Sequence, residues 1–329
     1  MTEPAHAPPH HELAPVTDIR GLRHHDDAVR RPEARFRRLF DNAPVGMAFL
    51  DDRQQIVSAN DALCRMLEYS PSQLAGRTLR ELTPAEDVHR AEELTVRLFA
   101  GDLDRFTVEK RLVASTGRVV WAELNVSRLD RSTPREAIAM ISDVTARKCA
   151  ETELIHRATH DPLTSLPNRN LLDDRIQLVQ ARSDRSGQFF AVLYVDLDGF
   201  KSVNDRHGHA TGDDVLTMIA GCIAQAVRPS DTVARVGGDE FVVLCEDLGA
   251  GGKAAKRAAA EVATRVRVAV SSGCASRATT VPLSASIGIV VARGFATAPA
   301  AMIAAADTAM YVAKTAPKSN RSYRAVSGA

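Results

Sequence analysis

The chain has 329 residues, of which 45% are hydrophobic and 25% are charged, a length and composition that suit two soluble globular domains. Its 42 basic and 41 acidic residues give a formal net charge of +1, which excludes the strong overall field of a protein drawn to nucleic acid or to an anionic membrane. No stretch approaches the ~20 consecutive apolar residues of a membrane span, and the first residues lack the apolar core of a signal peptide.

The five cysteines lie far apart, are odd in number and never form a C-x-x-C pair, a pattern that favours reduced thiols over disulfides or a zinc site. We therefore expect a cytoplasmic protein that neither binds nucleic acid nor spans a membrane. Any anionic ligand must then be held by a local site.

Residues 1–32 are rich in proline and histidine and show little apolar periodicity, which predicts a disordered arm. Clustered histidines can bind a metal, but histidines scattered through a proline-rich segment are more often exposed to solvent.

Residues 33–145 predict a small antiparallel sheet that cups a pocket. A helix opens the segment, with Phe36, Leu39 and Phe40 on one face. Strands are predicted over 45–51 and 54–60, then a helix with three apolar residues inward (Leu63, Met66 and Leu67), then strands over 105–114, 118–129 and 137–144. In the strand over 118–129, one face is apolar at every second residue: Val120, Ala122, Leu124 and Val126.

The opening FDNAPVGMAFLDDRQQIVSANDALCRMLEYSPSQLAGR and the exit ISDVTARKCAETEL resemble the PAS family. The resemblance implies a sensor domain over 33–145, with a ligand that the sequence leaves unknown. His89 is a candidate haem ligand, although a histidine on a helix surface is the commoner explanation. Cys64 lacks the surroundings expected of a flavin-adduct cysteine.

Residues 146–160 predict a helix without glycine or proline, stiff enough to transmit a twist or shift between two domains. The alternative is a passive helical spacer.

The remaining residues, 161–325, predict a mixed sheet with flanking helices, in an α/β (α+β) domain. Residues 189–198 form a nearly continuous apolar run, typical of a buried central strand. Residues 232–236 and 240–247 flank Gly237 and Gly238 as a hairpin, and a further strand is predicted over 284–292. Helices are predicted over 212–227, 253–270 and 300–315.

Acidic residues stand at the end of the central strand, in Asp196-Leu197-Asp198, and at the hairpin tip, in Asp239 and Glu240. If the two places meet, Asp196 and Asp239 supply the hard oxygen ligands that Mg²⁺ prefers beside phosphate oxygens. The paired glycines let a phosphate approach the backbone N–H groups. Taken alone, the same residues could form an ordinary turn at a solvated edge.

Five blocks resemble, in order and spacing, the GGDEF family of diguanylate cyclases: HDPLTSLPNR, DLDGFKSVNDRHGHATGD, RVGGDEF, SASIG and ADTAMYVAK. The resemblance implies condensation of two GTP into cyclic di-GMP, with release of two pyrophosphates. It assigns Mg²⁺ (or Mn²⁺) to Asp196, to Asp239 and to the backbone carbonyl of Leu197. Asp239 is then the proton acceptor, and Glu240 is a supporting acid.

The resemblance also assigns GTP contacts. Asn204 and Asp213 would bind guanine, because an amide and a carboxylate complement its polar edge. Without the resemblance, Asn204 fits a turn in a loop and Asp213 a helix N-cap. Gly237 and Gly238 would lie along the phosphates, and Lys314 would bind them. Lys318 stands where the family usually has arginine, which keeps the charge but loses the bidentate fork.

Arg228 and Asp231 match the family's R-x-x-D site, where cyclic di-GMP binds as a feedback inhibitor; the alternative is a surface arginine at a helix end with an aspartate in a turn. Each domain would hold one GTP, so the active enzyme would be a homodimer. A catalytically silent domain that acts as a receptor for GTP or cyclic di-GMP is the main alternative, but its mark would be a broken acid, and the acids are intact. A purely PAS interaction protein is disfavoured by the second half.

Overall fold

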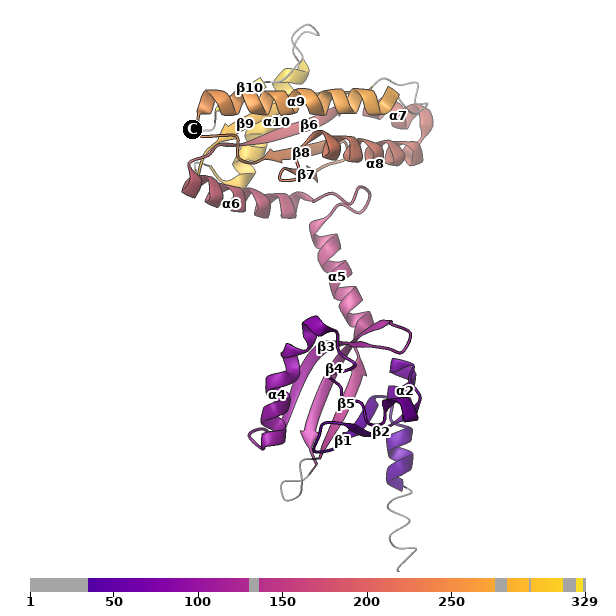
Figure 1. Cartoon of the computed structure of the whole chain (residues 1–329). Helices are drawn as coiled ribbons and strands as arrows, with labels where there is room; N and C mark the ends of the chain where they lie inside the picture. The colour runs from indigo at the N-terminus through magenta and orange to yellow at the C-terminus, as the bar shows by residue number, and fades with distance from the viewer. Residues whose placement is uncertain (1–34, 130–135, 276–282, 296, 316–323, 328–329) are drawn as a thin grey trace, which may run out of the picture. The chain divides into compact units, whose positions relative to one another are not determined.

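The computed structural model describes residues 35–129, 136–275, 283–295, 297–315 and 324–327 (Figure 1). The predicted disordered arm at 1–32 lies outside these residues. The chain divides into two compact units, Met1–Ala150 and Glu151–Ala329. None of the described helices combines the length and the apolar character needed to cross a bilayer.

The first unit is built on a five-stranded antiparallel sheet with the order β2-β1-β5-β4-β3. Its strands are β1 (Gly46–Leu50), β2 (Ile56–Ala59), β3 (Arg105–Val113), β4 (Val119–Arg128) and β5 (Ala137–Asp143). The segment between β2 and β3 forms α2 (Asp61–Leu67), α3 (Pro71–Leu74), the 3₁₀ helix η1 (Ala85–Asp87) and α4 (His89–Ala100). These helices pack against the sheet around one shared core, so the predicted antiparallel fold is confirmed.

The pattern along β4 explains which face of this sheet is buried. Val120, Ala122, Leu124 and Val126 are each at most 3% exposed, whereas Val119 is 46% exposed. Successive side chains of a strand point to opposite faces, so the apolar alternation in the sequence fixes the register of the core. Asn60 then fixes the start of α2, because its buried side-chain oxygen accepts hydrogen bonds from the N–H groups of Leu63 (3.0 Å) and Met47 (2.8 Å).

The helix that opens this unit, residues 35–41, buries less than its apolar pattern predicts. Phe40 is 8% exposed, but Phe36 is 53% exposed and Leu39 is 66% exposed. The end of the helix is tied down, because the Asn60 side chain donates a hydrogen bond to the Phe40 carbonyl at 2.9 Å. In the preceding turn the ring of Phe36 contacts Phe40, with centroids 6.2 Å apart, and Phe49 on β1, with centroids 5.8 Å apart, although Phe36 stays largely exposed.

The helix α5 (Thr145–Thr159) follows β5 and contains neither glycine nor proline, as predicted. Its first residue is bonded to the first unit, where the Thr145 hydroxyl oxygen accepts from the Trp121 N–H at 3.0 Å. Its last turn is bonded to the second unit, where the Asn168 side chain donates to the Ala158 carbonyl at 2.9 Å. None of its residues is buried.

The second unit has a five-stranded sheet with the order β10-β9-β6-β8-β7. Its strands are β6 (Phe190–Asp198), β7 (Thr232–Arg235), β8 (Glu240–Cys245), β9 (Ser284–Ala292) and β10 (Arg324–Ser327). The pairs are antiparallel except β9 with β10, so the predicted mixed sheet is confirmed, with β6 in the middle (Figure 1).

Helices cover both faces of this sheet: α6 (Arg169–Ser186), α7 (Phe200–His207), α8 (His209–Ala226), α9 (Gly252–Ala275) and α10 (Pro299–Thr315). One core joins the sheet to α7, α8 and α9, and a second core joins the other face to α6 and α10. Two covered faces explain why β6 is buried along almost its whole length.

In the segment after β6, the structural alternatives to the guanine-binding role of Asn204 and Asp213 are both wrong. Asn204 lies inside α7 and not in a loop, and Asp213 lies inside α8 and not at its N-cap. The predicted start of α8 is three residues late, because α7 and α8 are separated by Gly208 alone, whose φ of +82° ends one helix before the next begins.

Candidate functional site

The end of β6 and the tip of the β7–β8 hairpin meet, which is the condition that the sequence set for a metal site there. Asp196 is directly opposite Glu240 in the antiparallel register, and the Leu197 N–H donates a hydrogen bond to the Asp239 carbonyl at 3.2 Å. Asp196 is 8% exposed, while Asp239 is half-buried. The other acid of this strand end, Asp198, accepts hydrogen bonds at 2.9 Å from the hydroxyls of Ser284 and Ser286 on β9.

An ammonium group lies beside these carboxylates. Lys314, on the last turn of α10, donates from Nζ to Asp196 Oδ1 at 2.5 Å. Burial disfavours its charge, but the hydrogen bond and charge of Asp196, with smaller contributions from Asp198 and Asp239, raise the pKa of Lys314. Burial and the neighbouring Asp196 carboxylate raise the pKa of Asp239. The site therefore concentrates negative charge that one lysine only partly balances.

These groups fit a divalent metal ion. The described residues contain no cluster of three or more histidine, cysteine or acidic side chains that could hold a metal by itself. Mg²⁺, however, is commonly bound through one or two carboxylates together with substrate phosphates and water. Asp196 and Asp239 are two such oxygen donors on adjoining strand ends, and the pKa of Asp239 is raised in part by the repulsion between them, which a cation would relieve.

The hairpin tip has a tight geometry that its first glycine makes possible. The Val236 N–H donates to the Glu240 carbonyl at 3.0 Å and closes the turn. A Cβ at Gly237 would lie 2.1 Å from Glu240 Oε2, so this position must stay free of a side chain, whereas a Cβ at Gly238 would meet open space. The Glu240 carboxylate thus folds over the turn that carries Asp239.

Arg235 and Asp161 hold this turn in place, a role that the sequence reasoning missed. The Arg235 guanidinium donates to the Gly238 carbonyl at 2.8 Å and to Asp161 Oδ1 at 2.8 Å. An open polar recess of about 370 Å³ lies alongside, lined by Asp161, Arg169, Arg235 and Gly237 among others. Both residues lie in the sequence blocks that resemble the GGDEF family, but only the fold brings together positions 74 residues apart.

The two proposed guanine contacts lie on α7 and α8. Asn204 Oδ1 is buried, and no group among the described residues donates a hydrogen bond to it. A Cβ at Gly212 would lie 1.9 Å from this oxygen, so the start of α8 packs directly against the amide. Asp213 follows Gly212 and is exposed. A buried acceptor without a donor and an adjacent free-standing carboxylate suit a ligand that presents N–H groups.

Arg228 and Asp231 lie in the loop between α8 and β7. The Asp231 carboxylate accepts from the Arg228 N–H at 3.0 Å and from the Glu246 N–H at 3.2 Å, so it organises the loop. The Arg228 side chain is exposed. No hydrogen bond or ion pair in the described part of the chain joins this loop to Asp196 or Asp239. Lys318 lies outside the described residues.

The sensor candidates in the first unit also have definite places. His89 is the exposed first residue of α4 and does not line the unit's pocket, which favours the helix-surface explanation over a haem ligand. Cys64 does not line it either. Cys64, Cys149, Cys222 and Cys245 are free thiols.

Comparison with known proteins gives matches for both units. Residues 158–320 match the family described as "Diguanylate cyclase, GGDEF domain", and residues 40–148 match the PAS fold. Diguanylate cyclase TpbB of Pseudomonas aeruginosa is 33% identical over 298 residues, which are 85% of this chain and 65% of TpbB. The bifunctional diguanylate cyclase/cyclic di-GMP phosphodiesterase MucR of the same organism is 41% identical over 62% of this chain and 28% of its own length. The chain thus spans less than two thirds of these relatives.

Solved structures resemble the second unit. The crystal structure of the GGDEF domain of YfiN (TpbB) from Pseudomonas aeruginosa is 38% identical, with a TM-score of 0.43, over 50% of this chain and 98% of that chain. The coiled coil and GGDEF domain of DgcB from Caulobacter crescentus, solved in complex with c-di-GMP, is 27% identical, with a TM-score of 0.47, over 56% of this chain and 93% of that chain.

Proposed function

The chain belongs to the GGDEF family of diguanylate cyclases, with a PAS fold ahead of the GGDEF domain, and from this premise we propose that it condenses two GTP into cyclic di-GMP and releases two pyrophosphates. The observation that carries the proposal is the meeting of Asp196 and Asp239 at adjoining strand ends, with Lys314 beside them. Intact acids at these positions favour catalysis over a silent receptor domain.

In the proposed reaction, the 3′-hydroxyl of one GTP attacks the α-phosphorus of the other, and the bond from that phosphorus to pyrophosphate breaks. Asp239 accepts the hydroxyl proton, and Glu240 supports it across the turn. Mg²⁺ or Mn²⁺, held by Asp196, Asp239 and the Leu197 carbonyl, would supply Lewis-acid stabilisation of the phosphate charge when bound. Lys314 binds the phosphates, and Gly237 and Gly238 leave room for them at the turn; we extend this phosphate role to Lys318.

Guanine is selected by Asn204 and Asp213. The buried Oδ1 of Asn204 accepts from an N–H of the base and so gains the donor that it lacks in the protein. The exposed Asp213 carboxylate accepts from the remaining N–H groups of that edge. Adenine presents an acceptor at N1 and a C–H at C2, where guanine presents N1–H and an amino group, so neither oxygen meets the N–H donor that guanine supplies.

Each GGDEF domain holds one GTP, so two copies of the chain must face each other in the active homodimer. The PAS domain, at 33–145, sets that arrangement through the linker at 146–160, whose helix α5 is bonded at both ends and contains neither glycine nor proline. Cyclic di-GMP binds at Arg228 and Asp231 and inhibits from outside the acid site. GTP as substrate and free thiols both suit a cytoplasmic location.

The test is the formation of cyclic di-GMP from GTP by Asp196→Ala and Asp239→Ala. Each change removes a proposed metal-binding carboxylate, so we expect no detectable product while circular dichroism shows an intact fold. Asp214→Ala is the matched control, because it removes an exposed acid from α8 outside the site, and it should keep normal activity. Activity of both site variants within tenfold of the wild type would contradict the proposal.

A further inference from the structure

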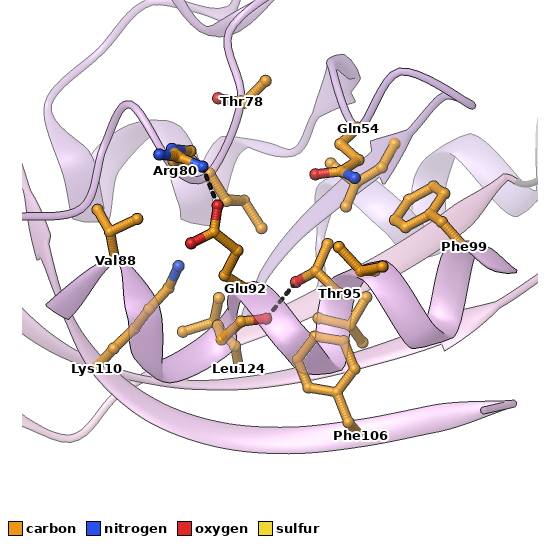
Figure 2. A pocket seen from close by; sticks show the side chains of 15 residues that line it. Gln54, Thr78, Arg80, Val88, Glu92, Thr95, Phe99, Phe106, Lys110 and Leu124 are labelled. Carbon is orange, nitrogen blue, oxygen red and sulfur yellow. Dashed lines mark hydrogen bonds and ion pairs between the residues drawn. The ribbon is translucent and has the colours of Figure 1, made fainter. Parts of the chain in front are cut away.

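The first unit contains a partly enclosed cavity of about 180 Å³ between α4 and the sheet (Figure 2). Most of its lining is apolar, including Leu50, Phe99, Phe106 and Leu124. Pockets for drug-sized ligands are typically about 300–1,000 Å³, so this cavity suits a smaller molecule. Its apolar walls favour a compact apolar body.

One lysine points into this cavity from β3 (Figure 2). The inward row of β3 runs through Phe106, Val108, Lys110 and Leu112, so Lys110 occupies a place where the alternation calls for an apolar residue. Lys110 is 4% exposed. Among the described residues, no hydrogen bond or ion pair to its Nζ is formed.

Asp87, the acid whose charge favours the protonated form of Lys110, is bound to other groups. Asp87, on η1, accepts hydrogen bonds from the Arg111 guanidinium at 2.7 Å and 3.1 Å, and Arg90 adds an ion pair at 3.7 Å. Burial lowers the pKa of Lys110 to about 8, against the attraction of Asp87, so the ammonium remains mostly charged at neutral pH. A buried charge without a partner is costly, and a ligand anion would remove that cost.

The other polar groups of the cavity define what the anion can be. Arg80 and Glu92 form an ion pair with each other at its edge, and the Thr95 hydroxyl donates to the Ala91 carbonyl at 2.7 Å. Gln54 faces the cavity with an amide that can donate or accept (Figure 2). The cavity therefore offers one cation that has no partner among the described residues, within mostly apolar walls, which complements one carboxylate on a short apolar body. A second carboxylate would be buried without a counter-ion.

We propose that this cavity binds a small apolar monocarboxylic acid, with its carboxylate on Lys110 Nζ and its body against the apolar walls formed by α4 and the sheet. The binding site is independent of the cyclase chemistry. Its use as the input that sets the cyclase rate rests on the function proposed above.

The test titrates the full chain, without nucleotide or divalent metal, with butyrate, hexanoate and benzoate by calorimetry, with hexan-1-ol as the uncharged match. Trp121 is the single tryptophan and lies in β4, so its fluorescence reports thermal unfolding of the first unit alone. We expect at least one acid to bind at sub-millimolar concentration and to raise this unfolding midpoint. Failure of all three acids at millimolar concentration, or equal binding of hexanol and hexanoate, would overturn the proposal.

Two variants separate the charge from the cavity. Lys110→Met keeps the length and removes the charge, and the loss of a charge-assisted contact should weaken binding by at least about tenfold. Ala91→Leu keeps Lys110 and fills the cavity from α4, and it should also abolish binding. Lys253→Met, at an exposed residue of α9, is the control. Acid binding to Lys110→Met as tight as to the wild type would overturn the assignment to Lys110.

A pH series adds a signature that a purely structural lysine would lack. Binding should weaken between pH 7 and pH 9.5 as Lys110 loses its proton, and Lys110→Met should show no such trend. The other charged groups around the cavity, Asp87, Glu92 and Arg80, are the same in the wild type and in Lys110→Met, so the difference between the two pH series isolates Lys110. Because these readouts need no turnover, they stand even if the chain makes no cyclic di-GMP.

Discussion

Each unit of the molecule places one lysine at its proposed ligand site, and the two lysines have opposite surroundings. Lys314 has a carboxylate of the protein 2.5 Å away and a side chain that is 42% exposed, whereas Lys110 is 4% exposed and has no partner among the described residues. In the GGDEF domain the fold pairs the charge of Lys314 with Asp196 before a ligand arrives. In the PAS domain the fold leaves the charge of Lys110 for the ligand to balance. A phosphate must therefore replace Asp196 as the partner of Lys314, which we call exchange, whereas a carboxylate would become the first partner of Lys110, which we call capture.

Lys314→Met tests the exchange side of this comparison and should have the largest effect. Loss of a charge-assisted contact worth roughly 1.5–3 kcal/mol should lower kcat/KM for GTP by about 10- to 150-fold. Steady-state kinetics against the Lys253→Met control measures this. An unchanged kcat/KM would mean that Lys314 serves Asp196 alone and never contacts phosphate.

Arg228→Ala asks whether the GGDEF domain has a second charged site apart from the acids. Product binding should weaken by about 10- to 150-fold, with little change in the initial rate, because Arg228 is exposed and remote from Asp196 in its contacts. Progress curves with added cyclic di-GMP measure the effect. Identical slowing of the variant and the wild type would make Arg228 an ordinary surface residue.

A two-residue insertion within 146–160 tests whether the two units are coupled at all. At about 3.6 residues per turn, it rotates everything beyond it by roughly 200°, which should change the cyclase rate several-fold and remove any response to a PAS ligand. A four-residue insertion, which restores most of the rotation, is the matched control. If both insertions leave rate and response unchanged, α5 is a passive spacer.

Asp87→Asn sharpens the comparison from the PAS side, with the smallest expected effect. Hydrogen bonds from Arg111, opposed by burial, lower the pKa of Asp87 from its usual 3.8 to about 2. Because the pKa of Asp87 is lower in the folded state than in the unfolded chain, its ionised carboxylate stabilises the folded unit above about pH 4. This stabilisation is lost as the pH falls toward 2. The variant should lose about 1 to 2 kcal/mol at neutral pH, with the gap closing in acid, as followed by Trp121 fluorescence. Glu92→Gln, in an exposed pair, should cost less than about 1 kcal/mol, and a gap that persists at pH 2 would contradict this account.

Much of this architecture follows from local pattern. Alternation in β4 and the apolar run of β6 predict the buried strands, and the GGDEF blocks place Asp196 and Asp239 at a strand end and a hairpin tip. Local pattern is insufficient at two places. Asn204 lies inside α7, which continues to His207 before Gly208 ends it, and Arg235 bonds Asp161 across 74 residues, a contact that only the fold makes. Lys110 stands visibly in an apolar strand pattern, but its lack of a partner depends on Asp87 being bound to Arg111, which no sequence pattern reveals.

The most direct test of the proposed function is a mass balance on the purified wild-type chain with GTP and Mg²⁺. Chromatography and a pyrophosphate assay should give one cyclic di-GMP and two pyrophosphates for every two GTP consumed. GTP that is bound but recovered unchanged would show a receptor domain, and conversion to GDP and phosphate would show a hydrolase; either result would contradict the diguanylate cyclase proposed here.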